Sequence, residues 1–178
     1  CRGFSFVGPK RGALSWWARR RKVNMGILQT PEVVVTAYDR ILVAVDFADE
    51  TAMLCERARD LSRRYQATLA MIHVVEPLVV EPAYDVLPSL PAGLEGEMEH
   101  HARKELLKLG DEYGVAQDHC WLQVGSTKTE ILRKAEEWGA DLILLGSHGR
   151  HGVELLLGST ANSVLHGARC DVLAVRVR

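Results

Sequence analysis

The sequence predicts an α/β domain built on a five-stranded parallel sheet, doubly wound and Rossmann-like. Five short runs rich in Ile, Leu and Val are separated by longer segments, most of which repeat apolar residues every three or four positions. The runs lack the polar alternation of a half-exposed strand, and this is typical of parallel strands that are buried on both faces. Because parallel strands need crossover connections, we expect helices on both faces of the sheet.

The five apolar runs are the predicted strands. In open parallel sheets, ligands bind outside the carboxyl ends of the strands, at the point where the strand order reverses. The residues that follow the strands are therefore the first candidates for a functional site. The runs cover residues 40–47, 68–75, 119–125, 140–146 and 170–177.

The segments between the strands carry helical periodicity and capping signals. Asp49 is placed to cap the first helix. Thr127, with Glu130 three residues later, forms a predicted capping box for a helix that ends at Trp138. A charged helical stretch covers residues 94–113. The expected apolar stripes are Leu54, Ala58, Leu61 and Tyr65 in the first helix and Leu106, Leu109 and Tyr113 in the charged one.

Two segments lie outside this pattern. Residues 76–93 hold four of the six prolines, which excludes a regular helix or central strand and predicts a long connecting loop. Residues 1–37 precede the first strand, and we expect them to be a basic, disordered extension in which Met25 is a plausible true start. The predicted domain then covers residues 38–178.

The charge of the chain is unevenly distributed. Residues 1–24 carry seven Lys or Arg and no acid, which leaves 15 basic and 23 acidic groups in residues 25–178, a formal charge of −8. An acidic domain argues against a nucleic-acid partner, since a basic face supplies most of the affinity there. No apolar run approaches the ~18 residues that span a bilayer, so we expect no membrane partner either.

The cysteines and histidines give little sign of catalysis. The four cysteines are far apart and form no C-x-x-C pair, so we expect buried, reduced thiols and a cytoplasmic location. His73 lies within an apolar run and is expected to be a hydrogen-bonded structural histidine. His100 and His101 lie on a charged helix and are expected to be solvated. No nucleophile is paired with a base at a spacing that indicates covalent catalysis.

The stretch LLGSHGRHGVELLLGSTANSVLHG, residues 144–167, is the main candidate site. Gly146 and Gly149 leave backbone N–H groups open to a phosphate, with His148 and Arg150 as candidate charge partners. No Walker-type Lys follows these glycines, and no G-x-G-x-x-G follows the first strand. The standard fingerprints of the P-loop and of dinucleotide binding are therefore absent.

The second half of this stretch predicts the start of a helix over about residues 159–166. Gly158, Ser159 and Thr160 offer free N–H groups, hydroxyls and the positive end of the helix dipole to an anion. Asp46, at the end of the first strand, is suited to ribose hydroxyls or to a cation. The alternative is a purely structural role for these residues. In that case Gly146 ends a strand, Ser159 caps a helix and Asp46 is an exposed turn carboxylate.

Four stretches between about residues 38 and 178 carry a resemblance to a known family: ILVAVDF, IHVVEP, GADLILLGSHGRHG and LLLGSTANSVLHGARCDVLAVRVR. Through these stretches the chain resembles the universal stress proteins. The resemblance implies a sheet with strand order 3-2-1-4-5 and a homodimer assembled through the C-terminal strand, residues 171–177. The apolar character of that strand suits edge pairing.

One branch of this family binds ATP through a motif of three glycines. Two residues separate the first glycine from the second, nine separate the second from the third, and Ser or Thr follows the third. This chain matches that motif, except that eight residues rather than nine separate Gly149 from Gly158. It keeps the glycines that the other branch lacks, so it resembles the ATP-binding branch, with Mg²⁺ or Mn²⁺ as the accompanying metal. The resemblance implies that the nucleotide contacts Ala44, Val45, Asp46, Val74, Gly146, Gly149, Gly158, Ser159 and Thr160. His148 and Arg150 complete the candidate site as charge partners for the phosphates.

Two functions follow from the resemblance. The first is a universal stress protein that binds ATP and acts in the stress response through nucleotide-dependent dimer or partner contacts. The alternative is a dimeric interaction module that binds no nucleotide, which the shortened glycine spacing supports. An adenine-nucleotide hydrolase would need a Ser-Gly-Gly-bearing loop where this chain has DFADE. With no evident base near the phosphate loop, we expect at most weak ATP hydrolysis.

Overall fold

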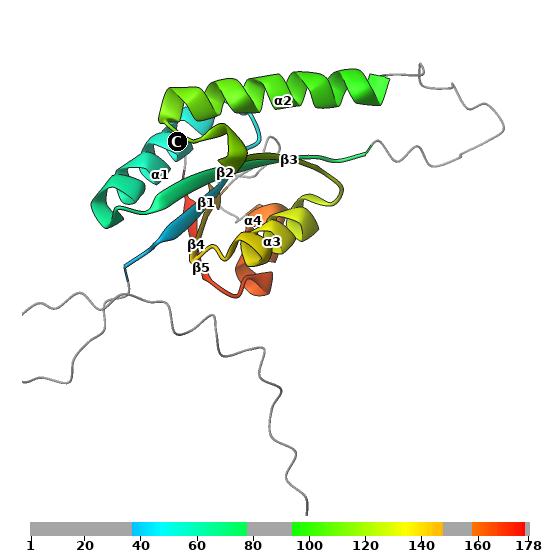
Figure 1. Cartoon of the computed structure of the whole chain (residues 1–178). Helices are drawn as coiled ribbons and strands as arrows, with labels where there is room; N and C mark the ends of the chain where they lie inside the picture. Colours follow the sequence, from blue (N-terminus) through cyan, green and yellow to red (C-terminus); the bar gives the residue numbers. More distant parts are fainter. Residues whose placement is uncertain (1–36, 78–93, 148–157, 177–178) are drawn as a thin grey trace, which may run out of the picture. The chain divides into compact units, whose positions relative to one another are not determined.

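A computed structural model describes residues 37–77, 94–147 and 158–176 and shows the expected parallel sheet (Figure 1). All neighbouring strands pair in parallel, in the order β3-β2-β1-β4-β5. The predicted sheet and the strand order implied by the resemblance are thereby confirmed. The described residues from Tyr38 onward belong to one compact unit. The strands are β1 (Arg40–Ala44), β2 (Thr68–Val75), β3 (Cys120–Val124), β4 (Leu142–Gly146) and β5 (Asp171–Val175).

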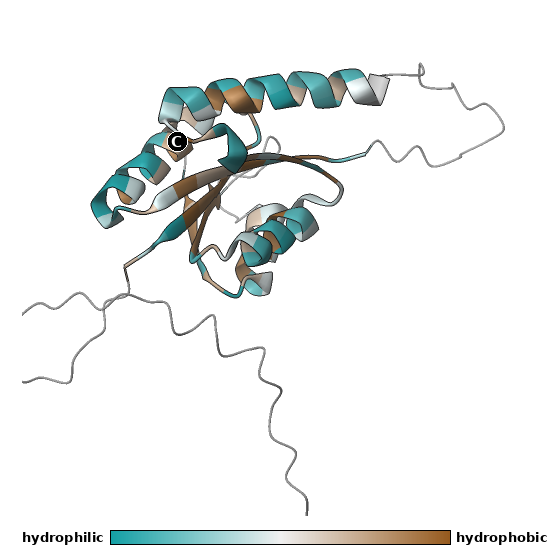
Figure 2. Ribbon diagram, in the orientation of Figure 1, coloured by the Kyte–Doolittle hydropathy of each residue, from teal (hydrophilic) through white to brown (hydrophobic). Residues whose placement is uncertain are grey.

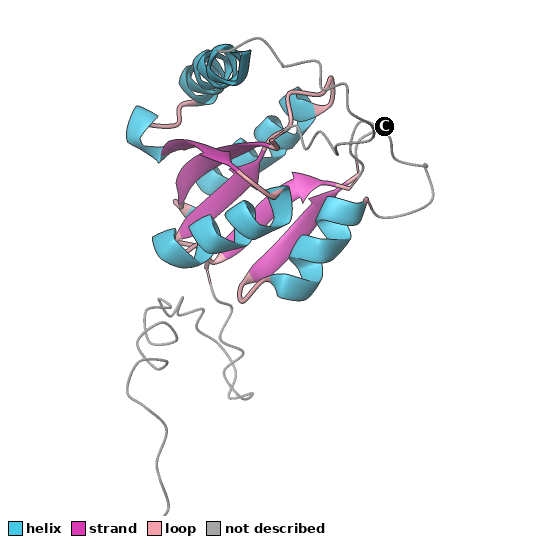
Figure 3. Cartoon of the chain, turned by 90° about the vertical axis from the view of Figure 1, so that its right-hand side faces the viewer, coloured by secondary structure: helices cyan, strands magenta, loops and turns pink. Residues whose placement is uncertain are grey.

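Helices cover both faces of this sheet. α1 and α2 pack on one face and α3 and α4 on the other (Figures 1 and 3), with hydrophobic strands between largely hydrophilic helices (Figure 2). None of the helices within the described ranges combines the length and the apolar character needed to cross a membrane. The helices are α1 (Thr51–Tyr65), α2 (Leu94–Tyr113), the short 3₁₀ helix η2 (Gln117–His119), α3 (Thr127–Trp138) and α4 (Ser159–Gly167).

The central strand β1 explains why the apolar runs are unbroken. Ile41, Leu42 and Val43 have no exposed surface. Ile41 and Val43 join the core beneath α1 and α2, whereas Leu42 joins the core beneath α3 and α4. Since successive side chains of a strand point to opposite faces, a strand covered on both faces needs an apolar residue at every position.

The predicted apolar stripes of α1 and α2 face the first of these cores. Leu54 and Ala58 of α1 are buried, as are Leu106 and Tyr113 of α2. Tyr65 lies at the end of α1 and remains 37% exposed. The helical periodicity therefore indicated the buried faces correctly, apart from this terminal residue. The two remaining stripe residues, Leu61 and Leu109, are half-buried.

The predicted cap of α1 is wrong. The helix begins at Thr51 and its N-cap position is Glu50, not Asp49, with no side-chain cap hydrogen bond. The backbone at Glu50 is already in the right-handed helical region, at φ −81° and ψ −7°. A side-chain cap usually requires an extended backbone at that position, so the local geometry leaves no place for one.

The capping box predicted for α3 is wrong as well. Thr127 is the first residue of the helix, and its N-cap is Ser126, which makes no side-chain cap hydrogen bond. A carboxylate from the end of β2 replaces the box, because the N–H and hydroxyl of Thr127 donate to Oε1 of Glu76 at 3.0 and 2.6 Å. Glu130 instead forms an ion pair with Arg133 at 2.8 Å.

The cysteines in the described ranges behave largely as predicted. Cys55 and Cys120 are buried. Burial raises the pKa of Cys55 to about 12 and also raises the pKa of Cys120, so both thiols stay protonated at neutral pH. Cys170 is half-buried, and Cys1 lies outside the described residues.

Polar contacts join the amino ends of the strands. The carboxylate of Asp141, next to β4, accepts the N–H of Asp39 at 2.7 Å and the N–H of Arg40 at 3.1 Å. In return, the N–H of Asp141 donates to the carbonyl of Arg40 at 3.0 Å. The hydroxyl of Tyr38 donates to Asp171, the first residue of β5, at 3.0 Å. This end of the sheet is therefore fixed by residues that take no part in the pocket at its other end.

A glycine sets the distance between α2 and β3. A Cβ placed on Gly110 would lie 2.5 Å from Sγ of the buried Cys120. A Cβ placed on Gly96, in the same helix, would meet no atom of the described residues within 4 Å. The helix therefore approaches the sheet at Gly110, where any side chain would meet the core.

Candidate functional site

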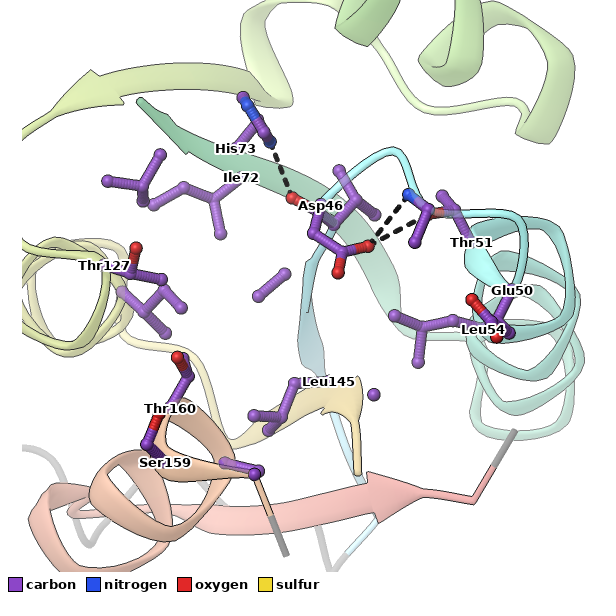
Figure 4. A pocket seen from close by; sticks show the side chains of 18 residues that line it. Asp46, Glu50, Thr51, Leu54, Ile72, His73, Thr127, Leu145, Ser159 and Thr160 are labelled. Carbon is purple, nitrogen blue, oxygen red and sulfur yellow. Dashed lines mark hydrogen bonds between the residues drawn. The ribbon is translucent and has the colours of Figure 1, made fainter. Parts of the chain in front are cut away.

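A pocket with a volume of about 220 Å³ opens at the carboxyl ends of β1, β2 and β4 (Figure 4). This edge of the sheet is where the sequence placed the candidate site. The structure brings eight of the predicted residues together there, and the other three, His148, Gly149 and Arg150, lie outside the described residues. The eight are Ala44, Val45, Asp46, Val74, Gly146, Gly158, Ser159 and Thr160.

Much of the pocket wall is apolar. Ile72 of β2, Ile131 of α3 and Leu145 of β4 line it beside Ala44 and Val74. Sequence reasoning did not include Ile72, Ile131 or Leu145 in the site, because their apolar periodicity is the same signal that marks the core. Concave apolar walls with a few polar groups are typical of small-molecule sites.

Carboxylates already occupy the starts of two helices at this pocket. Before α1, Oδ1 of Asp46 accepts the N–H of Ala48 at 3.1 Å and the hydroxyl of Thr51 at 3.3 Å (Figure 4). At α3, Glu76 accepts both donors of Thr127. Negative charges near helix N-termini offset the partial positive charge of the helix dipole. Asp46 therefore does act as a turn carboxylate, which is the structural alternative considered for it above.

The start of α4 carries no side chain at its N-cap position. Its N-cap is Gly158, and no residue in its first turn is acidic, which is also true of α1. Ser159 and Thr160 have exposed side chains and line the pocket. With a glycine at its N-cap and no acid in its first turn, the start of α4 is suited to an anionic group.

Backbone hydrogen bonds tie the two described ends of the glycine stretch together. The N–H of Gly158 donates to the carbonyl of Ser147 at 2.7 Å, and the N–H of Ser147 donates to the carbonyl of Val175 at 2.8 Å. Ser147 itself is buried. Gly146 and Gly158 therefore lie at the same pocket, although eleven residues separate them in the sequence.

The histidines in the described ranges agree with the predictions made for them. Nδ1 of His73 lies 2.7 Å from the carbonyl oxygen of Val45, and the imidazole packs against the ring of Phe47 with centroids 4.1 Å apart. His73 is half-buried and is hydrogen-bonded, as expected. His100 and His101 are exposed on α2.

Glu76 gives the fold a testable pH dependence. The hydrogen bonds from Thr127 lower the pKa of Glu76. A lowered pKa in the folded state contributes stability above the unfolded-state pKa, and this stability is lost as pH falls through the folded-state pKa. Since the pair is largely exposed and screened, we expect Glu76→Gln to lower the free energy of unfolding by only about 0.5 kcal/mol near neutral pH.

Urea unfolding of both forms between about pH 3 and pH 7 measures this difference, which should shrink below about pH 4. Glu105→Gln, in the middle of α2 and away from either helix end, serves as the control and should show no such trend. A difference between Glu76→Gln and the unaltered protein that stays constant over the whole range would contradict the prediction.

The fold and pocket together define a class of protein. β1 pairs with β2 on one side and with β4 on the other, so the strand order reverses beside it, and the pocket lies outside this point. This is the ligand-binding position of doubly wound α/β proteins. A model of the universal stress protein family matches residues 37–176. The chain belongs to the universal stress protein family.

Known relatives agree with this assignment over the same region. The chain is 43% identical over 144 residues to universal stress protein A homolog 2 of Coxiella burnetii, which covers 79% of this chain and 97% of the relative. Universal stress protein UspA from Lactobacillus plantarum is similar in structure, with 25% identity, a TM-score of 0.59 and coverage of 80% and 99%. A universal stress protein solved in complex with cAMP shares the fold, with 21% identity, a TM-score of 0.56 and coverage of 79% and 98%.

Proposed function

We propose that this universal stress protein binds ATP, together with Mg²⁺ or Mn²⁺, in the pocket at the carboxyl ends of the strands. It then acts in the cytoplasmic stress response through nucleotide-dependent dimer or partner contacts. The observation that carries the proposal is the division of the pocket into an apolar wall and the α4 N-terminus, whose first turn holds no acid. An adenine ring suits the first part and phosphates suit the second.

The residues present fit such a ligand. The side chains of Ala44, Val74 and Ile131 offer apolar contact to the base, and Asp46 offers carboxylate oxygens to the ribose hydroxyls. Ser159 and Thr160 offer hydroxyls and backbone N–H groups to the phosphates. His148 and Arg150 remain candidate charge partners outside the described residues.

The metal would arrive with the phosphates. Within residues 37–77, 94–147 and 158–176, no three His, Cys, Asp or Glu side chains come together in a group that could hold a metal ion. Phosphate oxygens are hard ligands of the kind that Mg²⁺ prefers. A divalent cation would neutralise phosphate charge that Asp46 and Glu50, both at the pocket, would otherwise repel.

The homodimer is part of this proposal. β5 is the last strand in the order β3-β2-β1-β4-β5, so within the described ranges no further strand pairs with its outer side. Leu173, in the middle of that strand, is 38% exposed. An exposed apolar side chain on an edge strand favours pairing through residues 171–177. Nucleotide could influence the pairing because the carbonyl of Val175, in the same strand, accepts the N–H of Ser147 beside the pocket.

Ser159→Asp tests the proposal at the α4 N-terminus. A carboxylate there should stabilise the helix slightly, by about 0.3–1 kcal/mol, while it occupies the position proposed for a phosphate. We therefore expect an unchanged or higher melting temperature and at least about tenfold weaker binding of Mg-ATP. Isothermal titration with Mg-ATP, and with cAMP as a second adenine nucleotide, measures the affinity.

Ser126→Asp is the matched control, because Ser126 is an exposed residue at the start of α3 and is not among the pocket-lining residues. It should leave the affinity within about threefold. Unaltered protein that gives no heat at concentrations able to detect micromolar binding would overturn the proposal. Native mass spectrometry of gently purified protein reports the dimer and any retained nucleotide in one measurement.

A further inference from the structure

The side chain of His73, in β2, is hydrogen-bonded to the peptide group that follows β1 and precedes the turn to α1. The N–H of Val45 still pairs with the sheet, donating to the carbonyl of Ile72 at 2.9 Å. The carbonyl of Val45 lies 2.7 Å from Nδ1 of His73 (Figure 4). Because a carbonyl oxygen only accepts hydrogen bonds, Nδ1 carries the proton. This carbonyl shares one planar peptide group with the nitrogen of Asp46, so His73 fixes the plane from which Asp46 projects.

The same imidazole also supports the residue on the other side of Asp46. Phe47 has φ at +57°, in the left-handed region that bulky residues rarely adopt. Its ring packs against His73 with centroids 4.1 Å apart and planes inclined by 33°. Such a conformation persists only where the surroundings hold it in place. The stacked ring is one such contact, and the N–H of Ala48 bound to Asp46 is another.

We infer that His73 is a positioning residue that sets the direction of the Asp46 carboxylate at the pocket. His73 contacts the peptide group before Asp46 and the ring after it, and His73 and Asp46 both line the pocket. The inference deepens the proposed function and rests on it only for the effect on nucleotide affinity. The effect on the turn is independent of any ligand.

Two substitutions separate the contacts of His73. His73→Phe keeps an aromatic ring against Phe47 and removes the donor to Val45. His73→Asn keeps an N–H donor near the position of Nδ1 and removes the ring. His119→Phe is the matched control. His119 packs against Trp121 and Trp138, and it precedes the amino end of β3, so it lies at the end of the strands opposite the pocket.

Two readouts follow these variants. The first is hydrogen exchange at the amide of Ala48, which reports the hydrogen bond to Asp46 without any ligand. We expect about tenfold faster exchange in His73→Phe, with amides in β4 and α3 unchanged, and exchange within about threefold of the unaltered protein in His73→Asn. The second is the Kd for Mg-ATP. We expect it to rise about tenfold in His73→Phe and about threefold in His73→Asn, and to stay unchanged in the control His119→Phe.

The outcomes distinguish the two proposals. If the unaltered protein binds no Mg-ATP, the proposed function fails, and amide exchange at Ala48 still decides the role of His73. If His73→Phe leaves that exchange rate unchanged, or accelerates exchange equally throughout the domain, the positioning role is overturned. Local acceleration at Ala48 that His73→Asn largely restores supports it.

Discussion

Replacing Asp141 by Ala is expected to lower the free energy of unfolding by about 2 kcal/mol. The carboxylate accepts the N–H groups of Asp39 and Arg40, where the central strand begins. Alanine would leave both donors without that acceptor, and the Asp39 donor is partly buried. An unsatisfied donor costs about 1–3 kcal/mol when water cannot replace the lost partner.

Urea or thermal unfolding measures this loss, and Asp60→Ala provides the comparison. Asp60 forms an exposed ion pair with Arg64 on α1 at 2.9 Å, a type of contact that contributes about 0–1 kcal/mol. The two variants remove the same side chain, so a larger loss at Asp141 reports its hydrogen bonds to the backbone. Equal losses would show that the contacts at the amino ends of the strands contribute no more than a surface pair. Neither residue lines the pocket, so the proposed nucleotide affinity should remain unchanged.

The same Gly→Ala substitution should have opposite effects at two positions of α2. At Gly110, the new methyl group would lie 2.5 Å from Sγ of Cys120, so we expect a net loss of about 1–3 kcal/mol from overpacking. At Gly96, the new methyl group would meet no atom within 4 Å in the part of the chain that the structure describes, so the better helix propensity of Ala should stabilise by up to about 1 kcal/mol.

The double variant Gly110→Ala/Cys120→Ala identifies the cause. Removing the sulfur makes room for the new methyl group, so the double variant should be more stable than the sum of the two single changes predicts. A double-mutant cycle on unfolding free energies should give a coupling of at least about 1 kcal/mol. Strict additivity, or a stabilising effect of Gly110→Ala alone, would contradict the close approach of α2 to the sheet.

The sheet could be predicted from sequence because burial on both faces leaves a strong local signal. Residues 68–75 were predicted as a strand and form β2 with the same bounds. The run at 40–47 was predicted too long, because β1 ends at Ala44 and the chain then turns at Asp46 and Phe47. Apolar composition continues past the last strand residue, since Val45 and Phe47 still pack against the core. Composition alone therefore does not mark where the strand pairing stops.

The helix starts show the limit of local rules. The sequence suggested Asp49 and Thr127 as caps because they lie beside the helices they would cap. The structure instead uses Asp46 for the turn before α1, and it uses Glu76, 51 residues from Thr127, at α3. A carboxylate delivered by another strand leaves no pattern within the helix or its flanks.

The pocket could be predicted in part for a similar reason. The family resemblance pointed to Asp46, Gly158 and their neighbours, and the parallel topology placed them at one edge of the sheet. Ile131 and Leu145 were missed, because an apolar residue facing a pocket has the same periodicity as one facing the core. His73 was predicted as a bonded structural histidine. Its contact with Phe47 depends on the left-handed backbone conformation of Phe47, which no pattern in the sequence predicts.

The hydrogen bond between Ser147 and Gly158 bears on the glycine spacing of this chain. It joins the two ends of residues 148–157, and the entropy lost on joining the ends of a segment grows only with the logarithm of its length. Removing one residue from about ten changes that entropic term by about 0.1 kcal/mol. The closure entropy therefore differs little between a spacing of eight residues and one of nine after Gly149.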